Sequence, residues 1–415
     1  MAHSMPHLRL ERIDAAVERL SERAFGFLDT LVRERSLPGE ETGAENVLAA
    51  ELDRIGLAVE RVRYPDGIER DPAAGGGAAD YADRRIVVGR LGPGGPGTLL
   101  LNGHLDVVPA GDERLWSSPP FAPHVHDGWM TGRGAGDMKA GLAMATLALE
   151  ALLSADPDAR AKSIAFVGAI EEERGGNGTL ASIRAGIVGD AVVVVEPTDL
   201  CILTSGIGVL WCEVEVFAAA GHALAAGPSM GAFSSALAVI EELRTLEGEL
   251  NTPPGPVHHS LNIGTLDAGD WQSAIPDTAR IGCRIGFPRT MRVADAMARV
   301  EAAVARAGER ISTPRPPALG WNGFRAEGYD LDAGDPLVQA VAAAHRSAHG
   351  EEPAVTATAG TTDARFYLNL LGVPALCYGP RVENMHAADE RVELASIVAG
   401  ARTLARFLDS WGRPT

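Results

Sequence analysis

Three short apolar runs each end in a residue that can bind a metal ion. The runs are 99–103 before His104, 164–170 before the glutamates at 171–173, and 191–195 before Glu196. Short runs rich in β-branched residues predict buried strands of a parallel sheet. Open α/β sheets bind their ligands beyond the carboxyl ends of the strands. The pattern therefore predicts an α/β fold that gathers a histidine and several carboxylates in one crevice, the ligand mix of a hydrolytic metal site.

The length and charge of the chain limit what it can be. A chain of 415 residues exceeds one ordinary hydrophobic core, so we expect two domains. A content of 46% hydrophobic and 22% charged residues is typical of a globular protein. The net charge of -18 disfavours nucleic acid as a partner, because that partner requires basic patches. No apolar run approaches the roughly 20 residues that cross a bilayer, so we expect no membrane partner, and residues 1–6 show no secretory signal.

Cysteine usage indicates a reducing compartment. The four cysteines are Cys201, Cys212, Cys283 and Cys377. None belongs to a CxxC pair, and each lies in or beside an apolar run, which predicts buried, reduced thiols. We therefore expect a cytoplasmic protein.

The hydrophobic pattern changes after Ser205. Residues 209–217 alternate between two faces, which predicts a half-buried antiparallel strand. The elements expected from there run strand, helix, strand, strand, helix, strand, an order typical of a ferredoxin-like α+β domain. We therefore predict an inserted domain at 205–321 within an α/β catalytic domain formed by 1–204 and 322–415.

Periodicity and turn residues predict the individual elements. Helices are expected at 8–35, 45–55, 179–185, 233–246, 293–307, 335–348, 362–371 and 394–411. Strands are expected at 58–63, 85–91, 98–102, 164–170, 191–195, 209–217, 260–267, 278–287, 318–325, 354–358 and 373–377. Residues 65–80 and 112–133 are expected to be irregular, and long loops inside compact domains are often functional.

The segment His104-Leu105-Asp106 fits a metal ligand with a supporting carboxylate. In an extended segment, side chains two residues apart point the same way. Asp106 would then accept a hydrogen bond from the His104 ring nitrogen that does not bind metal, which fixes the tautomer. A surface pair with no role is the alternative interpretation.

The glycine-rich segment 132–139 contains Asp137 near its end. A phosphate-binding loop is disfavoured, because neither GxxxxGKS nor GxxxxGKT occurs and no strand of the dinucleotide type precedes the segment. Close backbone packing that delivers Asp137 to the sheet edge is the better interpretation, and a carboxylate there suits a bridge between two metal ions. An Ala/Leu-rich helix follows, and aspartate is a good N-cap residue for it.

Further ligand-type residues complete the set. The glutamates at 171–173 would repel one another, and each would prefer solvent or a cation. A solvated charge run is the common alternative, whereas the functional interpretation gives one glutamate to metal and its neighbour to a water as general base. Glu196 lies at the rim of the sheet, because Pro197 cannot continue a central strand. His386 lies in a loop near the C-terminus.

These segments resemble the dinuclear zinc amidohydrolase family of aminoacylase, acetylornithine deacetylase, succinyl-diaminopimelate desuccinylase and bacterial glutamate carboxypeptidase. The resemblance covers nearly the whole chain, and the order and spacing of the motifs are specific. The motifs are NGHLDVVPAG (102–111), WSSPPF (116–121), GRGAGDMKAG (132–141), EEERGGNGT (171–179), EPT (196–198), GH (221–222), AGTTDARF (359–366), YGP (378–380) and HAADERV (386–392). The resemblance implies a zinc-exopeptidase-like catalytic domain with a mostly parallel sheet, and an inserted ferredoxin-like lid and dimerisation domain.

The resemblance also implies two zinc ions and assigns their ligands. The implied ligands are His104 and Glu196 on one ion, His386 and Glu173 on the other, and Asp137 between the two. Cobalt or manganese would also suit these mixed donors. Glu172 would be the general base, because the family's acid pair ends one residue before the turn that begins at Gly175. Asp106 would orient His104.

Substrate contacts are implied by the same resemblance. His222 resembles the lid histidine that reaches a substrate oxyanion, in its own site or in that of a partner subunit, and a turn histidine without a role is the alternative. Arg284 is a candidate clamp for a substrate carboxylate, because a guanidinium matches it bidentately, and a structural strand arginine is the alternative. Thr361, Thr362 and Asp363 form a polar turn near the site in the family.

One position departs from the family pattern. The family often has an asparagine shortly before a proline near the second lid strand, and this chain has Ser273 before Pro276. Substrate-carboxylate contacts of better-known members therefore do not transfer directly. The WSSPPF segment is more similar to a broad branch that resembles acetylornithine deacetylase and formylpyrimidine deformylase, whose substrates vary.

The combined interpretation is a two-metal amidohydrolase that removes the acyl group from an N-acyl amino acid or small N-acyl amine and forms a homodimer through its lid. The alternatives within this chemistry are a dipeptidase or carboxypeptidase, and a deformylase or deaminase of a small heterocycle. Outside it stand a catalytically silent small-molecule binding protein and a nucleotide-binding enzyme. The filled ligand positions disfavour the first of these, and the missing phosphate-loop motif disfavours the second.

Overall fold

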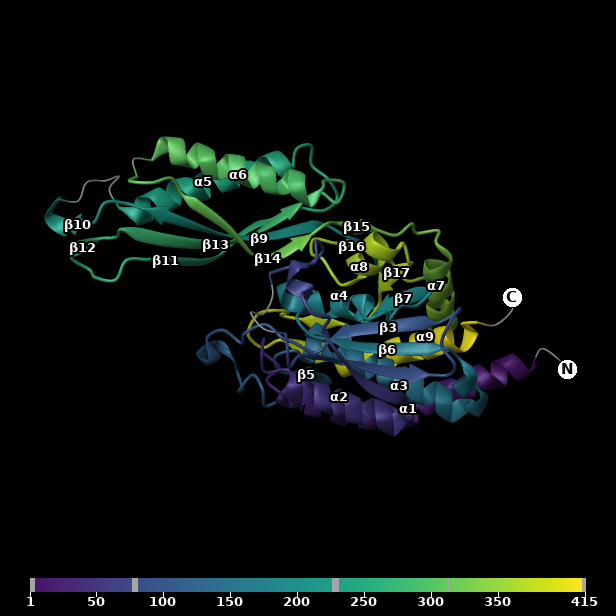
Figure 1. The fold of residues 1–415 in the computed structure, drawn as a ribbon. Coiled ribbons are helices and arrows are strands. Elements are labelled where there is room, and N and C mark those ends of the chain that lie inside the picture. The colour runs from purple at the N-terminus through teal and green to yellow at the C-terminus, as the bar shows by residue number, and fades with distance from the viewer. Residues whose placement is uncertain (1–3, 77–80, 226–230, 312, 413–415) are drawn as a thin grey trace.

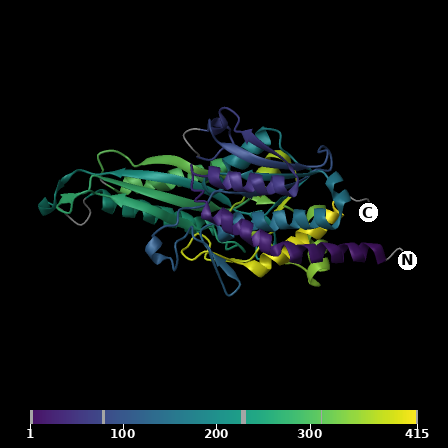
Figure 2. The same ribbon diagram turned by 90° about the horizontal axis from the view of Figure 1, so that it is seen from below.

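The computed structural model describes residues 4–76, 81–225, 231–311 and 313–412, and shows two sheet-based units (Figure 1). The larger unit has a nine-stranded sheet with helices on both faces, and the smaller has a four-stranded sheet with two helices on one face. The units lie end to end, so the molecule is elongated, as the view from below also shows (Figure 2).

The large sheet has parallel strands at its centre and antiparallel strands at its edges. Its strands are β1 (Ala58–Arg63), β2 (Arg85–Leu91), β3 (Leu99–His104), β6 (Ile164–Ala169), β7 (Ala191–Val194), β8 (Ile202–Gly206), β15 (Tyr329–Asp330), β16 (Val355–Thr358) and β17 (Ala375–Cys377). The order is β1-β2-β6-β3-β7-β17-β8-β15, with β16 also paired to β8. The pairs β6–β3, β3–β7 and β7–β17 are parallel, whereas β1–β2 and β2–β6 are antiparallel. The predicted α/β class is confirmed.

Helices bury the large sheet from both sides. They are α1 (Ser4–Arg33), α2 (Thr42–Ile55), α3 (Ala140–Ala155), α4 (Asn177–Arg184), α7 (Pro336–His349), α8 (Ala364–Phe366) and α9 (Leu394–Ser410). Helices α1, α2 and α3 lie on one face of the sheet, and α4 and α8 lie on the other (Figure 1). Every residue of β3, β6 and β7 is buried, which is why these strands are continuous apolar runs in the sequence.

Helix α3 corrects one prediction. Within the described residues, 135–155 is the one helical stretch long and apolar enough to cross a membrane. The prediction that no run approaches this length is therefore wrong. The stretch is 89% buried and packs between α1 and α9, so its composition reflects a core helix that is covered on all sides.

The start of α3 also differs from the sequence-based expectation. Asp137 is not its N-cap, because the helix begins at Ala140 and the Asp137 backbone is extended, with φ -109° and ψ 104°. The Asp137 side chain therefore faces the sheet edge instead of the first turn of the helix.

The smaller unit, called the lid here, has its own core. It contains β9 (Gly208–Phe217), α5 (Ala232–Leu250), β11 (Leu261–Ala268), β13 (Thr278–Phe287), α6 (Val293–Arg310) and β14 (Ala318–Ala326). The sheet order β11-β13-β9-β14, antiparallel throughout, confirms the predicted ferredoxin-like order. Strand β8 of the large sheet ends at Gly206, and strand β14 of the lid sheet ends at Ala326. The domain limits at 205–321 stay a prediction.

Short strands complete the fold around these two units. They are β4 (His124–His126), β5 (Trp129–Thr131), β18 (Val382–Glu383) and β19 (Arg391–Glu393), which form one sheet, and β10 (Gly221–His222) with β12 (Ala274–Ile275), which form another. The expected irregular stretch 112–133 thus contains β4 and β5. Of the expected loop 65–80, residues 77–80 lie outside the described residues, as do residues 1–3 of the N-terminal segment.

Candidate active site

The carboxyl ends of β6, β3 and β7 meet at one edge of the large sheet. His104 is the last residue of β3, Glu172 and Glu173 lie in the turn after β6, and Glu196 follows β7. The three glutamates line one cavity of about 300 Å³ together with Asp137 and His386. The structure thus brings together the acids and histidines that the sequence placed at strand ends.

The Asp137 carboxylate lies between two imidazoles. Its Oδ1 is 3.2 Å from His104 Nε2, and its Oδ2 is 3.1 Å from His386 Nε2. Glu173 Oε1 is also 3.1 Å from His386 Nε2. Two oxygens of one carboxylate thus face two different ring nitrogens, which is the arrangement of a bridging ligand.

The spacing of the donor set fits a metal ion. His104 Nδ1 lies 2.9 Å from the main-chain oxygen of Asp106, so both ring nitrogens face groups that only accept hydrogen bonds. A neutral imidazole has one N–H and satisfies one of them. Burial lowers the pKa of His104, but the hydrogen bond to Asp137 and the nearby acids raise it well above its usual range, so without a metal ion the protonated ring donates to both. Two ligands of one tetrahedral zinc lie about 3.4 Å apart, given bonds of about 2.0–2.2 Å, close to the separations seen here. The ligand atoms of His104, Asp137 and Glu173 all lie within 4.8 Å of one another.

The predicted contact between Asp106 and His104 is made by a different atom. The ring nitrogen bonds the Asp106 carbonyl, while the carboxylate Oδ1 lies 3.6 Å away. The carboxylate instead accepts the main-chain N–H groups of Glu172 and Glu173, at 3.2 and 3.1 Å. Asp106 therefore fixes both the His104 tautomer and the turn that carries the acids.

Burial perturbs the acids of the site. It raises the pKa of Glu196 to about 8, and it raises the pKa of Glu172 well above its usual range, with the nearby Asp363 adding to the shift. Burial alone would raise the pKa of Asp137 and lower that of His386. Hydrogen bonds to His104 and His386 instead lower the pKa of Asp137. Hydrogen bonds to Asp137 and Glu173 raise the pKa of His386 to about 11. Carboxylates crowded this closely are stabilised by a bound cation.

The lid supplies the opposite wall of the cavity. Arg284 lines it and is half-buried, and this partial burial lowers its pKa. Its guanidinium donates to Ser260 Oγ and to the Ala359 carbonyl, both at 3.1 Å. No carboxylate among the described residues pairs with it. Trp211, which lies directly across from it on β9, also lines the cavity.

The polar turn 361–363 is only partly at the cavity. Thr361 and Thr362 line it, and the Thr361 hydroxyl is buried with no hydrogen-bond partner in the described part of the chain. Asp363 is not a lining residue, because its side chain is buried and accepts from Thr179 Oγ1 at 2.6 Å. A direct substrate contact for Asp363 is therefore not supported by this arrangement.

His222 lies outside the cavity of its own chain. It is exposed on β10, at the end of the lid away from the large sheet (Figure 1). Its Nδ1 accepts the main-chain N–H of Leu224 at 3.2 Å, so the proton of the neutral ring is on Nε2. The neutral ring thus offers its Nε2–H as a hydrogen-bond donor.

Two charged residues near the ligands were missed by the sequence analysis. Glu390 and Arg133 form a fully buried ion pair beside Asp137 and His386. Both lie inside motifs that the sequence singles out, but their 257-residue separation gives no sign that they meet. The available signal was that two of the motifs contain residues of opposite charge that had no assigned role.

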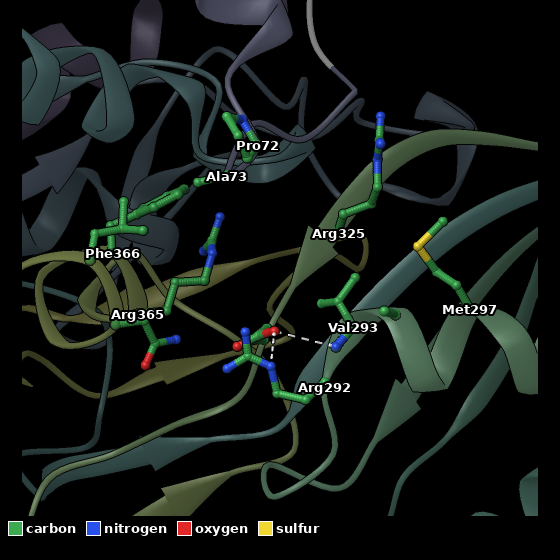
Figure 3. Close-up of a pocket in the computed structure, with 12 residues that line it drawn as sticks. Pro72, Ala73, Arg292, Val293, Met297, Arg325, Arg365 and Phe366 are labelled. Carbon is green, nitrogen blue, oxygen red and sulfur yellow. Dashed lines mark hydrogen bonds and ion pairs between the residues drawn. The ribbon is translucent and has the colours of Figure 1, made fainter.

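A second, larger cavity lies between the two units and contains none of the predicted site residues. It has a volume of about 420 Å³ and is lined by Arg292, Arg325 and Arg365 among others (Figure 3). Arg365 also donates to the carbonyl of Gly175, at 2.8 Å. This cavity holds no cluster of acids and does not compete with the first as a metal site.

Comparison with known proteins decides the family. The family model described as peptidase family M20/M25/M40 matches residues 100–410, and this range includes every predicted metal ligand. The chain belongs to this family. The resemblance seen in the motifs is therefore confirmed, and the M20 chain is a hydrolase that acts on amide bonds.

Relatives and solved structures extend over nearly the whole M20 chain. It is 33% identical over 408 residues to a succinyl-diaminopimelate desuccinylase of Methylobacterium sp. (strain 4-46), covering 92% of this chain and 94% of the relative. It is 29% identical over 396 residues to the enzyme of the same name from Paracoccus denitrificans (strain Pd 1222), covering 92% and 96%.

Two solved structures share the M20 fold at lower identity. The di-peptidase Dug1p from Saccharomyces cerevisiae matches with a TM-score of 0.80 and 16% identity, covering 98% of this chain and 99% of that one. The Bacillus subtilis YXEP protein, described as a dinuclear metal binding peptidase, matches with a TM-score of 0.60 and 14% identity, covering 94% and 98%. They support the same catalytic and lid architecture.

Proposed function

We propose that this protein is a two-metal amidohydrolase that removes the acyl group from an N-acyl amino acid, in the manner of a desuccinylase or deacetylase. One observation carries the proposal. The Asp137 carboxylate faces His104 with one oxygen and His386 with the other, in a cavity whose opposite wall holds the unpaired Arg284. A metal-bridging group thus faces a group suited to a substrate carboxylate.

Two divalent cations, zinc in our proposal, would be held in the cavity at this edge of the large sheet. The proposed ligands are His104 and Glu196 for one cation, His386 and Glu173 for the other, and Asp137 for both. When bound, such a pair polarises the scissile carbonyl and makes water more acidic. Mixed imidazole and carboxylate donors suit zinc, and cobalt or manganese remain alternatives.

Glu172 is the proposed general base. Its main-chain N–H donates to the Asp106 carboxylate, which fixes the position of its Cα in the cavity wall. Its carboxylate takes a proton from the attacking water and later delivers that proton to the leaving amine nitrogen. The burial that raises its pKa increases its basicity, which suits proton capture near neutral pH.

Arg284 is the proposed clamp for the carboxylate of the substrate. Two of its N–H groups are used by Ser260 and Ala359, and three of its five donors remain. The Thr361 hydroxyl, with no partner in the described residues, is a second proposed contact, and Thr362 lies beside it. Asp363 would act indirectly, by holding Thr179 behind the cavity.

We also propose a homodimer through the lid. Strand β11 forms an edge of the lid sheet with exposed residues, and Phe233 and Leu237 of α5 are exposed apolar side chains near it. Edge strands pair readily with another copy. His222, which cannot serve its own cavity from the tip of the lid, would then donate its Nε2–H to an oxyanion in the partner subunit's site.

Free thiols support a proposed cytoplasmic location. All four cysteines are described and none forms a disulfide. A reducing compartment maintains such thiols.

A hydrolysis screen tests the proposed function. N-succinyl, N-acetyl and N-formyl amino acids and dipeptides would be offered with added zinc or cobalt, and we expect turnover of N-acyl amino acids. Preference for dipeptides would replace the deacylase assignment by a peptidase one. In Glu172→Ala we expect both metals to remain and turnover to be nearly lost; a variant with normal turnover would refute the assignment of the base.

A further inference from the structure

Two fully buried charges connect the segments that carry Asp137 and His386. Glu390, just before β19, and Arg133, just after β5, are each at most 1% exposed and form an ion pair. Such a pair is weak evidence for stability, because desolvation offsets much of the attraction. The contacts of these two side chains show what else they do.

Glu390 holds the main chain of Asp137. Its Oε1 accepts the N–H of Gly136 at 2.9 Å and that of Asp137 at 3.0 Å. A Cβ on Gly136 would lie 3.3 Å from Glu390 Oε1 and 2.9 Å from Val382 Cγ1, so the close packing on both sides favours glycine there. Asp137 has an extended backbone without helical support, so Glu390 fixes the origin of the bridging side chain.

Arg133 holds the loop of His386. Its Nη2 donates to the Ala387 carbonyl at 3.2 Å, and its guanidinium lies over the Trp116 ring at 5.2 Å. The loop contains three non-glycine residues with left-handed backbone: Asn384 (φ 58°), His386 (φ 62°) and Asp389 (φ 56°). Residues in this region persist when the surrounding structure holds them, and Arg133 supplies one such restraint next to His386.

We propose that Arg133 and Glu390 form a positioning clamp that holds both the bridging Asp137 and the loop of His386. The metal position of His386 and Glu173 then depends on two clamp contacts, whereas that of His104 shares only the one to Asp137. This inference rests on the proposed two-metal function. His104 is anchored on β3 and through Asp106, and neither clamp residue bonds it. The two metal positions therefore depend unequally on the clamp.

Two variants weaken the clamp in different ways. Glu390→Gln keeps an oxygen for the N–H groups of Gly136 and Asp137 but presents a neutral group to Arg133. Arg133→Lys keeps the charge and loses the second arm that reaches Ala387. Asp409→Asn is the matched control, because Asp409 is also buried and paired with an arginine, Arg9 at 2.5 Å, beyond the other end of α3.

The test is a titration of metal-free, full-length protein with Co²⁺, followed by calorimetry and visible absorption. In the clamp variants we expect the first dissociation constant to stay within about threefold of wild type and the second to weaken about 10–100-fold, the usual effect of losing a group that orients ligands. Asp409→Asn should keep both dissociation constants, even if it lowers the melting temperature as much as the clamp variants do.

Two results would overturn the clamp. One result is that both clamp variants keep both wild-type dissociation constants. The other is that the two dissociation constants weaken by the same factor. Arg133→Lys carries the test alone if Glu390→Gln does not fold. A wild-type protein that binds no cobalt would instead overturn the proposed two-metal function, and the inference with it, so the two failures are distinguishable.

Discussion

The two walls of the cavity differ in chemistry. The wall from the large sheet presents Glu172, Glu173 and Glu196 with Asp137, whereas the wall from the lid presents Val209, Trp211 and Phe324 with one guanidinium, that of Arg284. The first wall is rigid, because it stands at the ends of fully buried strands. The second belongs to a unit with its own core. We conclude that reaction and recognition are placed on separate units.

The difference follows from where charge can be buried. Acids are held at strand ends because main-chain N–H groups and imidazoles there compensate them, as Asp106 and His104 illustrate. The lid sheet offers no such cluster in its described residues, and its helix-facing side is apolar. Substitutions on the two sides should therefore affect different kinetic constants.

The largest effect is expected on the sheet side. Asp137→Asn replaces a bridging carboxylate with a neutral amide between two imidazoles. We expect loss of metal from the purified protein and a fall in kcat of at least about 1000-fold, measured by metal analysis and by turnover. The same change in the lid, Asp295→Asn on the exposed side of α6 and away from β11, should leave both unchanged; equal effects at the two positions would erase the distinction.

His222→Ala should have the next largest effect. Loss of an oxyanion donor lowers kcat by about 100–1000-fold, and we expect the metal content to be retained. Mixing this variant with Glu172→Ala should restore part of the activity, because one site of a mixed dimer would have both groups. No recovery after verified subunit exchange would argue against a shared site.

Arg284→Ala should separate recognition from reaction. A charge-assisted contact to the substrate carboxylate is lost, so we expect KM to rise about 10–100-fold, with kcat nearly unchanged. Arg280→Ala, which changes an exposed arginine on the same strand that pairs with Glu215, is the control. A fall in kcat with normal KM would place Arg284 with the reacting groups instead.

The last prediction concerns pH. In the metal-free protein the pKa of Glu196 is about 8 and that of His386 about 11, so both groups carry protons that metal must displace. Metal affinity should therefore fall about tenfold per pH unit below 8 for each proton displaced. Binding of a product carboxylate at Arg284 should stay constant from pH 6 to 8, since a guanidinium remains charged. Competition titrations with a chelator at several pH values would measure the metal affinity. A metal affinity that does not change with pH would contradict the prediction.

Local sequence determined the acids and histidines at strand ends. Glu173 and Glu196 follow apolar runs by a few residues, and parallel strands bring such ends together whatever the rest of the chain does. His104 is placed in the same way. The ferredoxin-like order of the lid can also be predicted, because helices and strands differ in the period at which apolar residues recur.

Tertiary structure decided the rest. Asp137 reads as a helix cap from its neighbours, but a carboxylate 253 residues away holds its main chain outside the helix. The atom of Asp106 that meets His104 depends on how the strand end bends, and the sequence cannot rank a carbonyl against a carboxylate. Side-chain patterns report local backbone geometry; which distant charges are buried together depends on packing that no local pattern encodes.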